Sequence, residues 1–133
     1  MGAWSVTAFG NDEAMDWMFD LQEEGIPLIK ETLDNVLDDD DYIDLLFSDS
    51  AIAAAEVIAG ALGSPGANLP KEVSSWLKRA KYRPTSGEVN LALAAIRKVR
   101  ADSETKDLWE ESDKYGEWQS AMDDLEARLQ KHL

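Results

Sequence analysis

No cysteine occurs among the 133 residues of this chain. This absence excludes disulfide bonds, thiolate nucleophiles and cysteine-ligated metals, and it fits a reducing compartment such as the cytoplasm. Histidine is nearly absent too, because the single His132 lies one residue from the C-terminus. A chain end is expected to fray, and a frayed base cannot stay within hydrogen-bonding reach of a nucleophile. We therefore expect no catalytic triad or dyad, and predict that the protein is not an enzyme.

Long apolar runs are also missing. The longest weakly polar stretch, Ala51 to Gly63, contains Glu56 and is shorter than the roughly 20 residues that a membrane-spanning helix needs. The N-terminus has neither the basic region nor the apolar segment of a secretory signal peptide. These features predict a cytoplasmic protein that does not bind or cross a membrane.

Basic residues are scarce in the first third of the chain. Residues 1–50 contain 14 acidic residues and one base, a net charge of −13, whereas residues 51–133 contain 13 acidic and 12 basic residues, a net charge of −1. Within that second part, Lys71 to Arg100 holds eight bases and two acids, or +6. Such a field repels nucleic-acid phosphate and anionic membranes and attracts basic proteins. The acidity serves either solubility, with internal pairing to the basic segment, or recognition of a basic partner.

Capping residues and apolar spacing predict about six helices joined by short loops. Asn11 can cap the first helix and Gly25 can end it, and Pro27 suits the first turn of the second. The third helix is expected from about Ser50 to Leu62, and its many alanines place it at the centre. We expect an all-α, compact bundle that forms one domain over residues 1–133, with an irregular N-terminal arm.

Similar signals mark the starts and ends of helices in the second half of the chain. Pro70 opens a fourth helix and Pro84 ends that segment, and Thr85 to Glu88 matches a capping box that starts the fifth. The last helical region begins at Ser103, and Gly116 is expected to kink or divide it. Before the central helix, the segment Tyr42–Phe47 is either a helical turn or an extended piece.

A run of aspartates offers the one plausible metal site. Hard cations such as calcium take clustered carboxylate oxygens, and Asp38 to Asp41 with Asp44 could supply them. An EF-hand loop, however, requires Gly at its sixth position and Glu at its twelfth, where this sequence has Ile43 and Asp49. A solvated acidic loop is the favoured interpretation, so we expect neither a metal nor a cofactor.

Aromatic residues in the N-terminal arm have two interpretations. Trp17, Trp76 and Trp118 fall on helical apolar stripes and are expected in the core. Trp4 and Phe9 precede the first helix, and the favoured interpretation is that they clamp the arm over the bundle. The alternative is an aromatic anchor beside acidic groups, as in many interface hot spots.

Several short motifs occur in order along the chain and form a recognisable combination. Met1-Gly2-Ala3-Trp4 is followed by Phe9, Asn11-Asp12, Ala14 and Asp16-Trp17, and later by Ala53-Ala54-Ala55-Glu56-Val57, Leu69-Pro70, Asp102-Ser103-Glu104, Leu108-Trp109-Glu110 and Trp118. Together they resemble the signature of a largely bacterial family, domain of unknown function 4259. Ser5 and Thr7 depart from it, because the family usually has Gly there, and Gly permits backbone geometries that Ser and Thr resist. The resemblance implies an α-helical domain without recognised catalytic residues and implies no reaction.

The leading functional hypothesis is a non-catalytic acidic domain that binds a basic protein. In its most concrete form the protein is an immunity-type inhibitor that covers a basic toxin. The candidate partner-binding residues are Glu31, Asp34, Asp38, Asp39, Asp40, Asp41 and Asp44, joined by Trp4, Phe9 and Asp12.

Two other hypotheses stay open. One is a structural or regulatory homo-oligomer assembled through the apolar seam Tyr115–Leu129, since the sequence leaves the oligomeric state undecided. The other is a metal-dependent enzyme that uses the acidic loop. Binding of nucleic acid through the basic segment is opposed by the overall charge.

Overall fold

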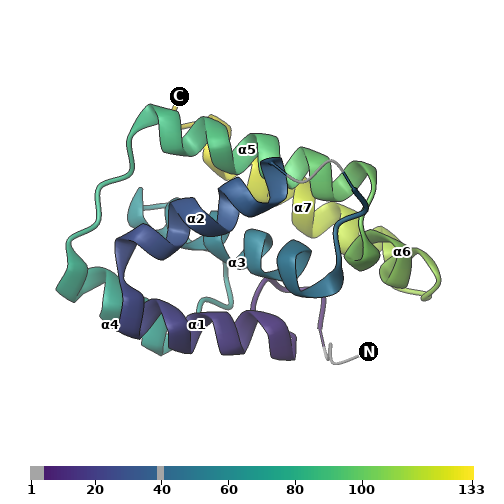
Figure 1. Ribbon diagram of the computed structural model, residues 1–133, viewed down its shortest axis with the longest axis horizontal. Coiled ribbons are helices and arrows are strands. Elements are labelled where there is room, and N and C mark those ends of the chain that lie inside the picture. Colours follow the sequence, from purple (N-terminus) through teal and green to yellow (C-terminus); the bar gives the residue numbers. More distant parts are fainter. Residues whose placement is uncertain (1–4, 39–40) are drawn as a thin grey trace.

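The computed structural model describes residues 5–38 and 41–133 of the chain. These residues form seven helices and no strand, as Figure 1 shows: α1 (Asp12–Glu24), α2 (Ile26–Leu37), α3 (Leu45–Ala61), α4 (Lys71–Ala80), α5 (Ser86–Ala101), α6 (Glu104–Glu110) and α7 (Tyr115–Gln130). The prediction of an all-α fold is confirmed, with one helix more than the expected six. No helix within the described ranges combines the length and the apolar character needed to cross a bilayer.

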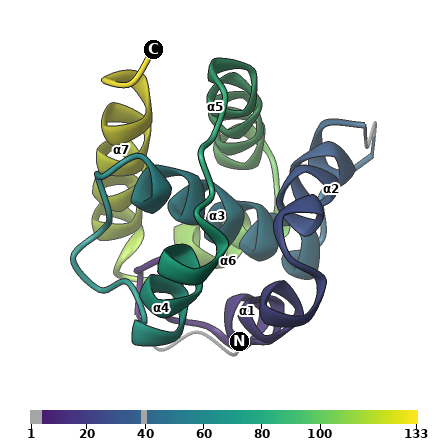
Figure 2. The ribbon, with the colours of Figure 1, turned by 90° about the vertical axis from the view of Figure 1, so that its left-hand side faces the viewer.

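Helix α3 lies at the centre of the molecule. It contacts each of the other six helices, and in Figure 2 α2 and α7 lie on opposite sides of it. Twelve of its 17 residues are buried, including the alanines at positions 51, 53, 54, 55 and 59. Small side chains allow neighbouring helices to approach closely, and a helix that is apolar on all sides is stable only inside the fold. The predicted central position is therefore confirmed.

The boundary between α1 and α2 follows the predicted signals. The side chain of Asn11 accepts a hydrogen bond of 2.8 Å from the backbone N–H of Ala14, which satisfies one unpaired donor of α1. Gly25 ends α1 with φ = 78°, a conformation that is open to residues without a Cβ, and Pro27 lies in the first turn of α2. The two helices can therefore follow each other with a single residue between them.

The start of α3 differs from the prediction. The helix begins at Leu45 and not near Ser50, because Asp44 caps it by accepting the Phe47 N–H at 2.9 Å. A second partner comes from a distant part of the chain, since the carboxylate of Glu104 accepts the Leu45 N–H at 2.8 Å. Ile43 is extended and its carbonyl accepts the Glu104 N–H at 2.9 Å. Contacts with α6 thus decide a boundary that local sequence left open.

The last helical region divides before Gly116 and not at it. Helix α6 ends at Glu110, and α7 starts at Tyr115. Between them, the hydroxyl of Ser112 donates to the Trp109 carbonyl at 2.7 Å and accepts the Lys114 N–H at 3.1 Å. These side-chain bonds replace helical backbone bonds and form a turn. Gly116 lies inside α7, where its predicted role as a break is wrong.

The predicted capping box of α5 is present, and the apolar seam of α7 is buried. Thr85 and Glu88 form the capping box at the start of α5 in both directions. Trp118, Met122, Leu125 and Leu129 are each no more than 2% exposed and lie in the core. The seam proposed for self-association is therefore used inside the protein, and Trp17 and Trp76 are also buried, as predicted.

Candidate functional site

The predicted acidic face is only partly assembled. Glu31 and Asp38 are exposed, and they lie on one side of α2 because seven residues make two helical turns. Asp34 is half-buried and accepts a hydrogen bond of 2.7 Å from Lys30 one turn earlier. Asp44 is exposed, but its carboxylate caps α3, and Asp41 is also exposed. The predicted residues that share one helix are therefore those of α2 and its C-terminal cap. The carboxylates of Asp34 and Asp44 are already engaged, in an ion pair with Lys30 and as the cap of α3.

The N-terminal candidate residues also differ in exposure. Asp12 is exposed in the first turn of α1. Phe9 is only 6% exposed and packs in the core, as the clamp interpretation predicts. Trp4, Asp39 and Asp40 lie outside the described residues.

Helix α1 presents an acidic stripe that the sequence analysis overlooked. Asp12, Asp16 and Asp20 follow one another at intervals of four residues, and all three side chains are exposed. Residues four apart lie on the same helix face, so the interval itself was a usable signal.

The stripe borders a groove between α1, α2 and the first turn of α3. The groove has a volume of about 170 Å³, with Asp16 and Asp20 on one wall and Leu46 and Phe47 on another. Leu46 is 52% exposed and Phe47 is 37% exposed, so two adjacent large apolar side chains contribute surface to this wall. Sequence reasoning missed both residues because it could not assign the conformation of Tyr42–Phe47.

A short hydrogen-bond chain fixes the floor of this groove. The indole N–H of Trp17 donates to the hydroxyl of Thr32 at 2.8 Å, and that hydroxyl donates to the Leu28 carbonyl at 2.7 Å. Thr32 is 6% exposed and Trp17 is 5% exposed. Because both polar groups are satisfied internally, they hold α1 against α2 and leave the groove preformed.

Two of the eight bases in the basic segment pair with helix α7. Arg97 donates to Glu126 at 3.0 Å, and Arg100 forms ion pairs with Glu126 and with Asp123, the latter at 2.7 Å. Lys98 instead donates to the Val36 carbonyl near the end of α2, at 2.7 Å. The two arginines therefore do not neutralise the carboxylates of α1.

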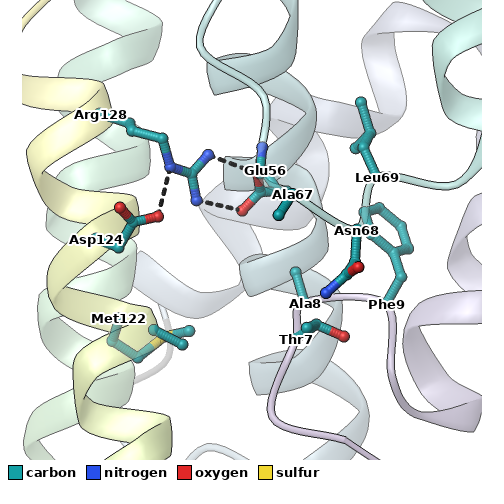
Figure 3. Close-up of a pocket in the computed structure, with 12 residues that line it drawn as sticks. Thr7, Ala8, Phe9, Glu56, Ala67, Asn68, Leu69, Met122, Asp124 and Arg128 are labelled. Carbon is teal, nitrogen blue, oxygen red and sulfur yellow. Dashed lines mark hydrogen bonds and ion pairs between the residues drawn. The ribbon is translucent and has the colours of Figure 1, made fainter.

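A second hollow lies on the α7 side of the molecule. Its volume is also about 170 Å³, and Figure 3 shows it between the arm residues Thr7–Phe9, the loop Gly66–Leu69 and the inner face of α7. At one end, Arg128 donates to the two oxygens of Glu56 at 2.6 and 3.0 Å and to Asp124 at 2.8 Å. The Gly66 N–H donates to the same Glu56 carboxylate at 2.7 Å. Burial alone would lower the pKa of Arg128, but the hydrogen bonds to these carboxylates raise it above its usual value.

The C-terminal histidine is held more firmly than the sequence suggested. The Nε2 atom of His132 lies 2.8 Å from the Ser64 hydroxyl, so the prediction of a frayed, unpartnered base is wrong. A serine beside a histidine is one element of a nucleophilic site. Ser64 is 7% exposed, however, and in the described ranges no residue accepts from the other ring nitrogen of His132. The contact closes the C-terminus onto the loop after α3.

A buried carboxyl group lies near the other end of α3. The pKa of Asp49 is raised to about 7: burial is the largest cause, the hydrogen bond from Thr105 opposes the shift, and the nearby charges of Glu13 and Glu104 add to it. The Thr105 hydroxyl donates to Asp49 at 2.7 Å and lies 2.6 Å from the Ser48 hydroxyl. Over the described part of the chain, no three acidic, cysteine or histidine residues are placed to share a metal ion.

Comparison with known proteins identifies the family. The model of the family described as domain of unknown function (DUF4259) matches residues 2–121 of the 133. Neither the curated proteins nor the solved structures contain a match. Because the family model covers most of the chain, the protein belongs to the DUF4259 family.

Proposed function

We propose that this protein is a non-catalytic binding domain that receives a basic, amphipathic segment of another protein in the groove between α1, α2 and α3. One observation carries the proposal. Of the six large apolar side chains that are exposed in the described residues, five lie between positions 19 and 47. That interval falls within the third of the chain whose net charge is −13.

The groove combines two kinds of attraction. Burial of Leu46 and Phe47 by a partner removes apolar surface from water, which contributes roughly 25 cal/mol per Å². The carboxylates of Asp16 and Asp20 line the same groove and attract Lys or Arg side chains. A partner segment with apolar residues flanked by basic ones satisfies both walls at once.

The most concrete form of this function is an immunity-type inhibitor that neutralises a basic toxin. A toxin that acts on nucleic acid or another anionic substrate needs a cationic cleft, and an acidic surface can cover that cleft. Glu31 and Asp38, which lie outside the groove on α2, would add to the long-range field that guides the partner. The same field opposes binding of nucleic acid and of anionic membranes.

The proposal predicts that a neighbouring gene encodes a basic protein, and calorimetry with that protein as the ligand tests it. Leu46→Ser removes an exposed apolar contact, and the double variant Asp16→Asn/Asp20→Asn removes two charges from the wall. Each change should weaken binding about tenfold or more, as central interface residues do. The charge variant should also lose most of the salt dependence of the association rate.

Two matched variants serve as controls. Leu133→Ser removes a side chain that is 59% exposed outside the groove. Glu111→Gln/Glu117→Gln removes two exposed charges from other positions. Both should bind like the unaltered protein. Equal losses in the control and groove variants would place the interface elsewhere, and no binding by the unaltered protein would contradict the inhibitor function.

A further inference from the structure

The hollow beside α7 is open to solvent on one side, like the groove, and its lining is mostly apolar with a polar end formed by Glu56, Asp124 and Arg128. Ala8, Phe9, Leu69 and Met122 supply its walls, and Phe9 and Met122 are 6% and 2% exposed. Water beside these apolar walls finds few hydrogen-bonding partners, so an apolar group can displace it favourably there. Its volume of about 170 Å³ is similar to that of apolar cavities that hold a benzene molecule, at about 150 Å³.

The polar end of this pocket carries an excess of negative charge. Glu56 and Asp124 contribute two carboxylates, and Arg128 contributes one positive charge, which leaves a net charge of −1. Glu56 already accepts from Arg128 and Gly66, so its carboxylate is internally satisfied. Asp124 uses one oxygen for Arg128, and its side chain is 65% exposed. The free oxygen of Asp124 is therefore the acceptor left for a ligand.

The same arrangement disfavours an anion. Four of the five N–H groups of Arg128 are engaged by Glu56, Asp124 and the Ser64 carbonyl. A carboxylate ligand would gain at most one hydrogen bond from this guanidinium and would meet two like charges. An ammonium group would instead balance the excess charge.

We propose that this pocket binds a small organic cation, in which an ammonium group is attached to an aromatic or branched apolar body of roughly six to ten non-hydrogen atoms. The apolar body lies against Phe9, Leu69 and Met122, and the ammonium group donates to Asp124. Asn68 lies at the rim with its amide directed toward the arm in Figure 3, where it can donate to or accept from a polar substituent. The site is on the opposite side of α3 from α2 and is separate from the groove.

The test is a titration followed by the backbone amide signals in NMR spectra. Benzylammonium is the probe, and benzyl alcohol and benzoate are neutral and anionic compounds of nearly the same shape. Benzylammonium should shift the signals of Ala8, Gly66 and Met122 and should bind about tenfold more tightly than benzyl alcohol, because a charge-assisted hydrogen bond is lost in the alcohol. Benzoate should not bind.

Variants assign this selectivity to the pocket. Asp124→Asn should weaken benzylammonium about tenfold and leave benzyl alcohol unchanged, so that the two bind alike. Asp123→Asn is the matched control, since it removes the same charge and one ion pair from the adjacent position of α7 and lies outside the pocket. Ala67→Leu, in an exposed loop position, should block all ligands by filling the pocket without disturbing the core.

Three results would overturn the proposal. Equal binding of all three compounds would show an unselective apolar hollow. Shifts that spread over α1 and α2, with no effect of Asp124→Asn, would show general attraction of cations to an acidic protein. Tighter binding of Nα-acetyl-lysine amide than of benzylammonium would assign the pocket to a protein side chain and not to a small molecule.

Discussion

Arg128 of α7 holds the buried carboxylate of Glu56 on α3 with two hydrogen bonds of 2.6 and 3.0 Å, across 72 positions of sequence. The side chain of Glu56 is 8% exposed and that of Arg128 is 16% exposed. The pair connects the central helix to the last one and closes one end of the pocket. Its consequences for stability can be measured directly.

Removal of one partner from this pair should be costly. Glu56→Ala leaves the guanidinium of Arg128 without its main counter-charge, and we expect a loss of about 3–5 kcal/mol in the free energy of unfolding. Replacement of both partners by apolar residues, Glu56→Leu/Arg128→Met, should recover most of that loss. Urea denaturation measures both. As a control, Arg97→Ala breaks a pair whose arginine is 55% exposed and should cost less than about 1 kcal/mol; a loss as large as that of Glu56→Ala would contradict the assigned role of burial.

The carboxylate of Glu56 also requires glycine at position 66. A Cβ atom at this position would lie 2.5 Å from an oxygen of Glu56, closer than real contacts allow. Gly66→Ala should therefore break the hydrogen bond from the Gly66 N–H and destabilise the protein by about 1–3 kcal/mol. Gly116→Ala is a suitable comparison, because no atom lies within 4 Å of the added carbon, and alanine in α7 should stabilise by up to about 1 kcal/mol. Thermal unfolding that ranks the two variants in the opposite order would refute this explanation.

The hydroxyl of Thr32 should matter more than its methyl group. Thr32→Val keeps the shape but leaves the buried indole N–H of Trp17 without its acceptor. The expected cost is about 1–3 kcal/mol. Thr32→Ser keeps the acceptor and should cost less than Thr32→Val. Chemical denaturation followed by tryptophan fluorescence distinguishes them, and equal stability of the two variants would show that this hydrogen bond is unimportant.

The raised pKa of Asp49 predicts that the free energy of unfolding depends on pH in an unusual way. Its pKa is about 7 in the folded chain, against 3.8 in the absence of the fold. Between these values the folded state holds a proton that the unfolded state has lost, so the contribution to stability falls as the pH rises through this window and levels off above about pH 7. Glu13 of α1 and Glu104 of α6 are the charged groups whose repulsion adds to the cost of ionisation.

Asp49→Asn should remove this dependence. The amide oxygen can still accept from Thr105, and no charge is buried at high pH. The variant should be more stable than the unaltered protein by roughly 2–4 kcal/mol at about pH 8, and the gain should shrink toward about pH 5. Denaturation across this range measures the difference. Asp20→Asn, an exposed change on α1, is the control; a constant gain at all pH values would mean that Asp49 is ionised throughout.

Local signals in the sequence predicted most helix boundaries. The Asn11 cap, Gly25 and the Thr85–Glu88 capping box act on the backbone within a few residues, so their effect does not depend on the rest of the fold. The start of α3 depends in part on a distant residue. Glu104 reaches the first turn of α3 from 59 positions away, a partner that no local pattern can reveal.

Composition likewise determined the all-α class, the central place of the alanine-rich helix and the acidic character of the first third. Only the tertiary structure decided which side chains are buried, exposed or paired. It buried Phe9 and the seam of α7, exposed Leu46 and Phe47 beside Asp16 and Asp20, and brought Glu56 and Arg128 together. Charge and helical periodicity are properties of neighbouring residues and can be read along the chain. Burial, pairing and cavities depend on which distant helices meet, and that is settled when the whole core packs.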